Sequence, residues 1–336
     1  MFDFIPTEYF LLAFGLILLI KGGDWFVDAA SGIAKRFKLP ELLIGATVVS
    51  IGTTLPEVMT SAMGALSGSG AIAYGNAIGS IICNTALIAA TTIAIKPGKA
   101  NKKTLIFPVC FFFGAAAFYL LNAYISKSFA LWAGIVLLCG FVVYMVINVL
   151  NMKKNPDEQH EIDLDTPEVN AENSALGMVK DIVMIIVGAA VIALGANLLV
   201  ENATAIAHQI GVPESVIALT VVAIGTSLPE LVTAITSLIK GHGALSLGNI
   251  IGANIFNLVL VSGVAITISP FDIPMNSVLF GQNASLVMDL PVMLAVMAIM
   301  TLPPLFTGKL KRWQGISLLA IYAAFMIIQF VFVKSV

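Results

Sequence analysis

The chain has 336 residues, of which 59% are hydrophobic and only 11% are charged, and its formal net charge is −2. This composition excludes an ordinary soluble domain, in which about a quarter of the residues are charged. It predicts an integral membrane protein, for which we expect no nucleic-acid partner.

The apolar residues form runs of 18 or more, separated by short breaks that contain charges, glycines or prolines. Runs of this length can cross a bilayer as helices, which satisfy their own backbone hydrogen bonds. Barrel-type alternation is absent, so we predict an all-α polytopic membrane protein with ten transmembrane helices. The expected spans are approximately 8–29, 40–66, 71–95, 104–125, 128–151, 178–205, 213–239, 244–268, 284–304 and 313–333.

The Lys and Arg residues of the loops indicate the orientation in the membrane. With the N-terminus outside, fourteen of them lie on the cytoplasmic side and two, Lys127 and Lys334, lie outside. Because cytoplasmic loops carry an excess of Lys and Arg, both termini are predicted to lie outside and the 152–177 linker in the cytoplasm. The expected location is the lipid bilayer of the prokaryotic cell (inner) membrane.

An internal repeat divides the chain into two halves. Residues 47–88 align with residues 220–261 at a constant offset of 173 without a gap, and 20 of the 42 positions are identical. Each copy belongs to a set of five spans, and an odd number of spans inverts the second set relative to the first. We therefore predict two inverted five-helix repeats, 1–151 and 178–336, joined by an acidic linker over 152–177. Secondary transporters with this architecture place their site near the bilayer midplane, where the repeats meet.

Each copy of the repeat places a carboxylate inside an apolar span. Such a charge costs about 3 kcal/mol at the bilayer centre and usually marks an ion pathway. Glu57 follows Thr53 and Thr54 by four and three residues, so both hydroxyl groups can share its helix face. Pro56 cannot donate a hydrogen bond to the carbonyl of Gly52, which frees backbone oxygen in the middle of the helix.

Every candidate ligand in the two copies is oxygen. Calcium and sodium ions prefer such ligands, whereas zinc and copper favour His and Cys. The chain has no HExxH motif and no Cys/His cluster, so an intramembrane zinc enzyme is not expected and no cofactor is predicted. The candidates are Thr53, Thr54, Glu57, Ser80 and Asn84 in the first copy and Thr226, Ser227, Glu230 and Asn257 in the second, where Ala253 replaces the serine.

At these motifs the chain resembles the cation/calcium exchanger family, in particular its compact prokaryotic sodium/calcium exchanger-like members. The resemblance rests on GTTLPE at 52–57, GNAIGSIICN at 75–84, GTSLPE at 225–230 and GNIIGANIFN at 248–257. It implies that the two glutamates coordinate calcium. The calcium and sodium sites that it implies are lined by Glu57, Glu230, Thr53, Thr54, Ser80, Asn84, Thr226, Ser227 and Asn257, with the carbonyl groups of Ser50 and Ala223.

Three positions depart from the family pattern. Ile81 stands where members commonly carry asparagine, and Ala253 stands where many carry serine, so one amide and one hydroxyl group are absent. Asn257 stands where the potassium-dependent branch carries aspartate, which argues against a potassium requirement.

The expected function is the exchange of Na⁺ for Ca²⁺ by a secondary-active antiporter, and no enzymatic activity is expected. The two ions are the predicted substrates, and no obligate protein partner is indicated. One alternative is a proton/calcium antiporter that uses the same two carboxylates. The other is a passive cation channel, which the inverted repeats and the closed set of ligands disfavour.

Several other residues receive structural interpretations. Asn76 and Asn249 are expected to hold helix ends or helix contacts, and Asp24 is expected to pair with Lys21, three residues before it. Cys83 is expected to be a small packing residue. Small residues let membrane helices approach closely, which is the role expected of the glycines at 75, 79, 248 and 252.

Overall fold

The structure is a computed structural model that describes residues 7–37, 41–154, 175–209, 225, 227–274 and 277–335. Within these residues, nine helices are long and apolar enough to cross a membrane, and α11 (Leu228–Ile239) is a shorter apolar helix. The predicted all-α polytopic fold is therefore confirmed. The seventh predicted span, 213–239, is described only in its second half.

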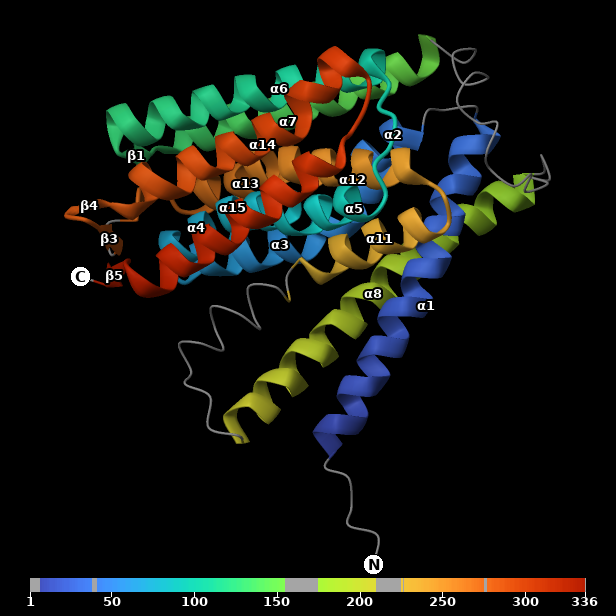
Figure 1. The fold of residues 1–336 in the computed structure, drawn as a ribbon, viewed down its shortest axis with the longest axis horizontal. Coiled ribbons are helices and arrows are strands. Elements are labelled where there is room, and N and C mark those ends of the chain that lie inside the picture. Colours follow the sequence, from blue (N-terminus) through green and yellow to red (C-terminus); the bar gives the residue numbers. More distant parts are fainter. Residues whose placement is uncertain are drawn as a thin grey trace, which may run out of the picture.

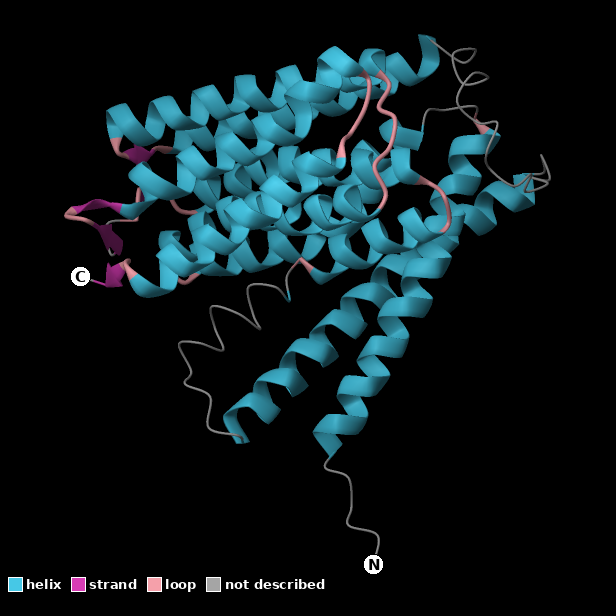
Figure 2. Cartoon of the chain, in the orientation of Figure 1, coloured by secondary structure: helices cyan, strands magenta, loops and turns pink. Residues whose placement is uncertain are grey.

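Helices make up almost all of the described chain (Figure 2). Those of the first half are α1 (Thr7–Arg36), α2 (Glu41–Ile44), α3 (Ser50–Leu66), α4 (Gly70–Cys83), α5 (Ala90–Ile95), α6 (Lys102–Leu121) and α7 (Leu131–Lys154). Those of the second half are α8 (Ala175–Gln209), α11, α12 (Gly243–Phe256), α13 (Ser262–Ile268), α14 (Leu290–Thr307) and α15 (Arg312–Val331).

The spans that carry the repeated motifs are the inner ones. In the most apolar 18-residue stretches of the spans Gly70–Ile95 and Gly243–Ile268, 72% and 83% of the residues are buried. In that of Arg312–Val331, 17% of the residues are buried. The peripheral helices therefore meet the lipid, and the motif helices meet one another. This arrangement lets polar groups inside the bilayer avoid contact with lipid chains.

Short π-helical segments interrupt these inner spans. Segment η1 (Gly45–Val49) precedes α3, η2 (Asn84–Ala89) separates α4 from α5, and η5 (Asn257–Val261) separates α12 from α13. Asn84 and Asn257, which the repeat aligns, thus begin two matching π-helical segments. Such segments inside α-helices occur frequently at functional sites. Two further segments, η3 (Asn122–Ser126) and η6 (Ser285–Asp289), lie at the ends of outer spans.

Helices α1 and α8 pack against each other and extend away from the other helices (Figure 1). A Cβ atom at Gly15 would lie 2.9 Å from the carbonyl oxygen of Gly195, and one at Gly195 would lie 2.8 Å from that of Gly15. The backbones of the two helices therefore touch, which only glycine allows. Because the offset of 173 aligns Gly15 with Gly188 and Gly22 with Gly195, both helices contribute matching glycines to this interface.

The cytoplasmic half of α1 is held to the end of α11 by an ion-pair cluster. Lys240 Nζ lies 2.7 Å from Asp28 Oδ1 and 3.3 Å from Asp24 Oδ1, and it also donates to the backbone carbonyl of Asp24. The predicted pairing of Asp24 with Lys21 is therefore wrong. That prediction considered only charges three or four residues apart on one helix, whereas the true partner comes from another helix.

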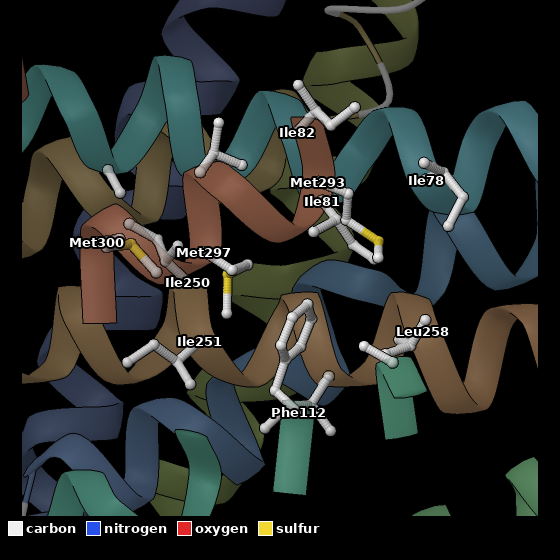
Figure 3. Packing of buried hydrophobic residues seen from close by; sticks show 14 of the residues in the cluster. Ile78, Ile81, Ile82, Phe112, Ile250, Ile251, Leu258, Met293, Met297 and Met300 are labelled. Carbon is white, nitrogen blue, oxygen red and sulfur yellow. The ribbon is translucent and has the colours of Figure 1, made fainter. Parts of the chain in front are cut away.

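A large hydrophobic cluster fixes the inner spans against α6 and α14 (Figure 3). Its members Ile81, Phe112, Ile251, Met293 and Met297 are fully buried. Methionine side chains adapt to irregular gaps, and those of α14 fill the space between α4 and α12. The inner helices are thus held in fixed positions around their polar residues.

Short strands join loops from the two halves at one end of the bundle (Figure 2). β1 (Ser128–Phe129) pairs antiparallel with β2 (Phe271–Asp272), and the rings of Phe129 and Phe271 lie 5.5 Å apart. β3 (Ser277–Leu279) pairs with β4 (Gln282–Asn283) and with β5 (Lys334–Ser335). Each strand has two or three residues, so the strands connect loops and leave the helical class of the fold unchanged.

Candidate functional site

Two glutamates, one from each repeat, are completely buried. Glu57 on α3 and Glu230 in the first turn of α11 are each 0% exposed. No described residue donates a hydrogen bond to any of their four carboxylate oxygens. The two carboxyl groups are close enough to interact electrostatically. Because two buried, unpaired carboxylates are very unfavourable when ionised, they require protons or cations between them.

Hydroxyl groups accompany both carboxylates. The side chains of Thr53 and Thr54, which the sequence places on the face of Glu57, also lie near the carboxyl group of Glu230 from the other repeat. Thr54 and Ser227 are buried, and their hydroxyl groups have no hydrogen-bond partner within the described part of the chain. Their oxygens are therefore free to bind an ion.

Two buried asparagines provide further oxygens. Asn84 and Asn257 are each 0% exposed, and no described residue bonds to their amide oxygens or nitrogens. Each stands where an α-helix changes into a π-helical segment. Ser80 is buried one turn before Asn84 on α4. Because the two asparagines occupy equivalent positions of the repeats and both amides lack hydrogen-bond partners, we infer that they line a ligand-binding site.

Asn76 and Asn249 connect helices, as the sequence indicates. Asn76 Nδ2 donates to the carbonyl oxygen of Glu57 at 3.0 Å and to Ser61 Oγ at 2.8 Å. Asn249 Nδ2 donates to Thr233 Oγ1 at 2.8 Å, and its Oδ1 accepts hydrogen bonds from two hydroxyl groups of α3. These contacts position the backbone around both glutamates.

The position of Ile81 explains why an amide can be absent there. Ile81 belongs to the hydrophobic cluster that also contains Met297 of α14 (Figure 3). Its repeat counterpart Asn254 donates to Thr85 Oγ1 at 2.7 Å and to Met297 Sδ at 3.1 Å. The second repeat thus uses this amide for helix contacts, and the first repeat uses an apolar side chain in the equivalent place.

Two predicted ligands, the side chain of Thr226 and the carbonyl group of Ala223, lie outside the described residues. Ser50 is described and buried where η1 joins α3. Its hydroxyl group donates to the carbonyl oxygens of Gly45 at 2.7 Å and Asn249 at 2.9 Å. This side chain therefore ties the beginning of α3 to α12 of the other repeat.

Cys83 is a buried residue that sequence reasoning assigned to packing and that the structure places beside the two glutamates. Its thiol lies near the side chains of Ser227 and Tyr322 and within electrostatic range of both carboxyl groups. The repeat counterpart of Cys83 is Phe256, so a comparison of the two copies does not indicate that Cys83 lies near the site. The one sequence feature that could indicate it is the position of Cys83 directly before Asn84.

The donor set favours hard cations. The described part of the chain contains no group of three or more His, Cys, Asp or Glu side chains that could hold a metal ion. Two carboxylates with hydroxyl and amide oxygens suit Ca²⁺ and Na⁺, which prefer oxygen ligands. A polytopic helical fold around such a pair of buried carboxylates fits a membrane transporter of cations.

Comparison with known proteins shows that the chain belongs to the sodium/calcium exchanger family. The family profile described as "Sodium/calcium exchanger protein" matches residues 7–150 and 180–331. The sodium/calcium exchanger MaX1 of Methanosarcina acetivorans is 32% identical, over 97% of this chain and 99% of the relative. An uncharacterized membrane protein of Methanocaldococcus jannaschii, MJ0091, is 36% identical, over 95% and 96% of the two chains.

A solved structure shares the fold over nearly the whole length. The sodium-calcium exchanger NCX_Mj, soaked with Na⁺ and Sr²⁺, gives a TM-score of 0.78 at 31% identity and covers 97% of this chain and 99% of its own. The chain is therefore a multi-pass transporter of the prokaryotic cell membrane, as its similar relatives indicate.

Proposed function

We propose that the protein exchanges Na⁺ for Ca²⁺ at a site that Glu57 and Glu230 share. The observation that carries this proposal is the pair of completely buried carboxylates without hydrogen-bond donors among the described residues. Membership of the sodium/calcium exchanger family supports cation/calcium exchange as the activity. The remaining proposed ligands are Thr53, Thr54, Ser80, Asn84, Thr226, Ser227 and Asn257, with the carbonyl groups of Ser50 and Ala223.

Charge balance explains why the two ions would exclude each other. One Ca²⁺ neutralises both carboxylates, and Na⁺ ions at separate positions neutralise them equally well. An empty site with two ionised carboxylates is strongly unfavourable inside a membrane, so the protein would change access from one side to the other only with an ion bound. A net transfer of Ca²⁺ in one direction therefore requires Na⁺ to move in the other, which is antiport.

Alternating access in this proposal comes from α1 and α8. These helices carry no candidate ligand, contact each other closely through Gly15 and Gly195, and extend away from the inner spans. Sliding of this pair would expose the site first to one side of the membrane and then to the other. Transporters built from inverted repeats commonly move one bundle against another around a fixed site.

Calcium uptake into sodium-loaded proteoliposomes tests the proposed function. An outward sodium gradient is expected to drive uptake in the absence of a pH gradient, and replacing internal sodium by potassium is expected to stop it. A pH gradient that drives uptake without sodium would establish the proton/calcium antiporter instead. Unitary currents in planar bilayers would establish a channel.

Calcium uptake is also expected to weaken as the pH decreases. A proton on Glu57 or Glu230 removes one of the two negative charges that neutralise Ca²⁺, so protons compete with calcium for the site. The apparent KM for calcium should therefore rise toward acid pH while the maximal rate at saturating calcium changes little. Uptake measured over a pH series at a constant sodium gradient provides the test, and a pH-independent KM would contradict it.

A further inference from the structure

Two cytoplasmic loops that are far apart in the sequence are joined through their backbones. Residues 96–101 connect α5 to α6, and residues 308–311 connect α14 to α15. Backbone hydrogen bonds of 3.0 and 2.8 Å flank an antiparallel bridge between Lys99 and Lys309. This pairing holds the two loops side by side at one face of the protein.

The joined loops form a surface that we call the basic platform. Neither stretch 94–104 nor stretch 305–315 contains Asp or Glu. The general excess of Lys and Arg in cytoplasmic loops explains why these residues lie on this side of the membrane. It does not explain why backbone pairing brings the basic residues of two separate loops together. The platform consists of seven exposed residues, Lys96, Lys99, Lys102, Lys103, Lys309, Lys311 and Arg312.

Exposed apolar side chains border the basic platform. Ile95, Phe306 and Trp313 are 65%, 78% and 49% exposed. Lys102 Nζ donates to the carbonyl oxygen of Phe306, and Arg312 Nη2 donates to that of Ile95 at 3.3 Å. Cations are thus fixed directly beside side chains that belong at the level of the acyl chains, and tryptophan is typical of this interface.

A small pocket that is open to solvent lies between the basic platform and the inner helices. Its walls are mostly apolar and include Ile93, Leu247 and Ile250, with Lys96 as the cation. Leu247 and Ile250 lie on α12, on either side of Asn249, which contacts α3 near the glutamates. Lys96 of the platform thus stands at the edge of a mostly apolar pocket.

We propose that the basic platform binds anionic phospholipids of the cytoplasmic leaflet, with their phosphate groups on the lysines and their acyl chains against the apolar border. Clusters of about four to eight basic residues beside a membrane helix attract anionic lipids in this way. The acidic linker over 152–177 is a second possible source of negative charge. Its apolar residues are few and scattered among acidic and polar ones, whereas an acyl chain offers a continuous apolar surface to Ile95, Phe306 and Trp313, so we favour the lipid.

Quenching of Trp313 fluorescence tests the proposal in the full-length protein. Trp25 and Trp132 are replaced by phenylalanine, so that Trp313 is the one remaining tryptophan. The protein is then reconstituted with brominated phosphatidylglycerol or with brominated phosphatidylcholine. The anionic lipid is expected to quench Trp313 at a lower mole fraction than the zwitterionic lipid, and this preference should shrink at high salt.

The test variant replaces Lys96, Lys99, Lys309 and Lys311 by glutamine. It spares Lys102 and Arg312, whose hydrogen bonds to carbonyl groups support the helix ends. Each basic residue near a membrane contributes roughly a fivefold factor to binding, so the preference for phosphatidylglycerol is expected to fall about tenfold or more. Fourteen cytoplasmic cations minus four leaves ten against two outside, so the orientation should be kept.

A matched control replaces four cytoplasmic lysines outside the platform by glutamine, namely Lys35, Lys153, Lys154 and Lys180. It should retain the lipid preference, because the total charge change is the same and only the position differs. Equal quenching by both lipids in the starting protein, or equal losses in the two variants, would overturn the proposal.

Two further outcomes would identify another occupant. If the starting protein shows no preference for phosphatidylglycerol, yet binds inorganic phosphate and loses that binding in the platform variant, the platform binds free phosphate rather than lipid. If the preference appears only after the acids of the 152–177 linker are replaced by their amides, the linker occupies the platform. Both results would refute the lipid proposal.

Discussion

Replacing Glu57 or Glu230 by glutamine is expected to abolish sodium-driven calcium uptake. Each substitution keeps the size of the side chain and removes one of the two charges that would neutralise Ca²⁺. Two unit charges 4 Å apart attract each other by about 4 kcal/mol at an effective dielectric constant of 20, and a divalent ion doubles this energy. A loss of calcium affinity of roughly a thousandfold or more is therefore expected. Initial uptake rates and calorimetric titration with calcium would measure it.

Stability separates a lost ligand from a misfolded protein. A neutral amide avoids the repulsion between two buried carboxylates, so without cations each glutamine variant should be at least as resistant to heating as the wild type. Glu201→Gln is the control, because Glu201 is an exposed carboxylate on α8, and it should leave uptake unchanged. Normal uptake by either of the two site variants, at equal protein content, would refute the shared site.

Replacing Gly248 or Gly252 by alanine is expected to disrupt the contact between the two repeats. A Cβ atom at Gly248 would lie 2.1 Å from the carbonyl oxygen of Leu42, and one at Gly252 would lie 2.3 Å from Ser50 Oγ and 2.6 Å from the backbone of Ala46. Backbone atoms cannot rotate out of the way, so α12 must move away from α2 and η1, which hold Leu42 and Ala46. Overpacking of this kind destabilises proteins by about 1 to 3 kcal/mol, and occasionally by more.

Thermal unfolding and calcium uptake together measure this effect. Gly114→Ala is the matched control, because Gly114 is exposed on α6 and no described atom lies within 4 Å of a Cβ added there. It should unfold at the wild-type temperature and transport calcium normally. If Gly248→Ala and Gly252→Ala behave like this control, the backbone contact of α12 with α2 and η1 does not carry the stability that we assign to it.

The sequence predicts the helical class and the central glutamates because both leave strong local signals. Long apolar runs identify membrane spans without any knowledge of packing. Glu57 and Glu230 are conspicuous as charges within those runs, and the repeat shows that they are equivalent. The expectation that glycines allow close helix approach agrees with the structure at Gly248 and Gly252. At Gly75 and Gly79 the expectation stays a prediction. The repeat equivalents of Leu42 and Ala46 are positions 215 and 219, which lie outside the described residues.

Features that depend on contacts between distant segments could not be predicted from the sequence. Asp24 has a lysine three residues before it, yet it pairs with Lys240, which follows another helix. Cys83 looks like any small residue of a membrane helix until the fold brings Ser227 next to it. The bridge between Lys99 and Lys309 joins two similarly charged loops, which no charge pattern would suggest. Each case is decided by tertiary packing, which overrides the local pattern.

The cluster of Lys240 with Asp24 and Asp28 breaks the two-fold equivalence of the repeats. The offset of 173 aligns Lys240 with Ser67, which cannot form an ion pair with α8 at the opposite face. If α1 and α8 slide as proposed, motion at the cytoplasmic face changes an ion pair and motion at the other face does not. A partly exposed pair contributes about 1 kcal/mol at most, or roughly a fivefold factor. With such sliding, this lysine would favour one of the two access states over the other, so the apparent calcium affinities at the two faces are expected to differ by up to about that factor.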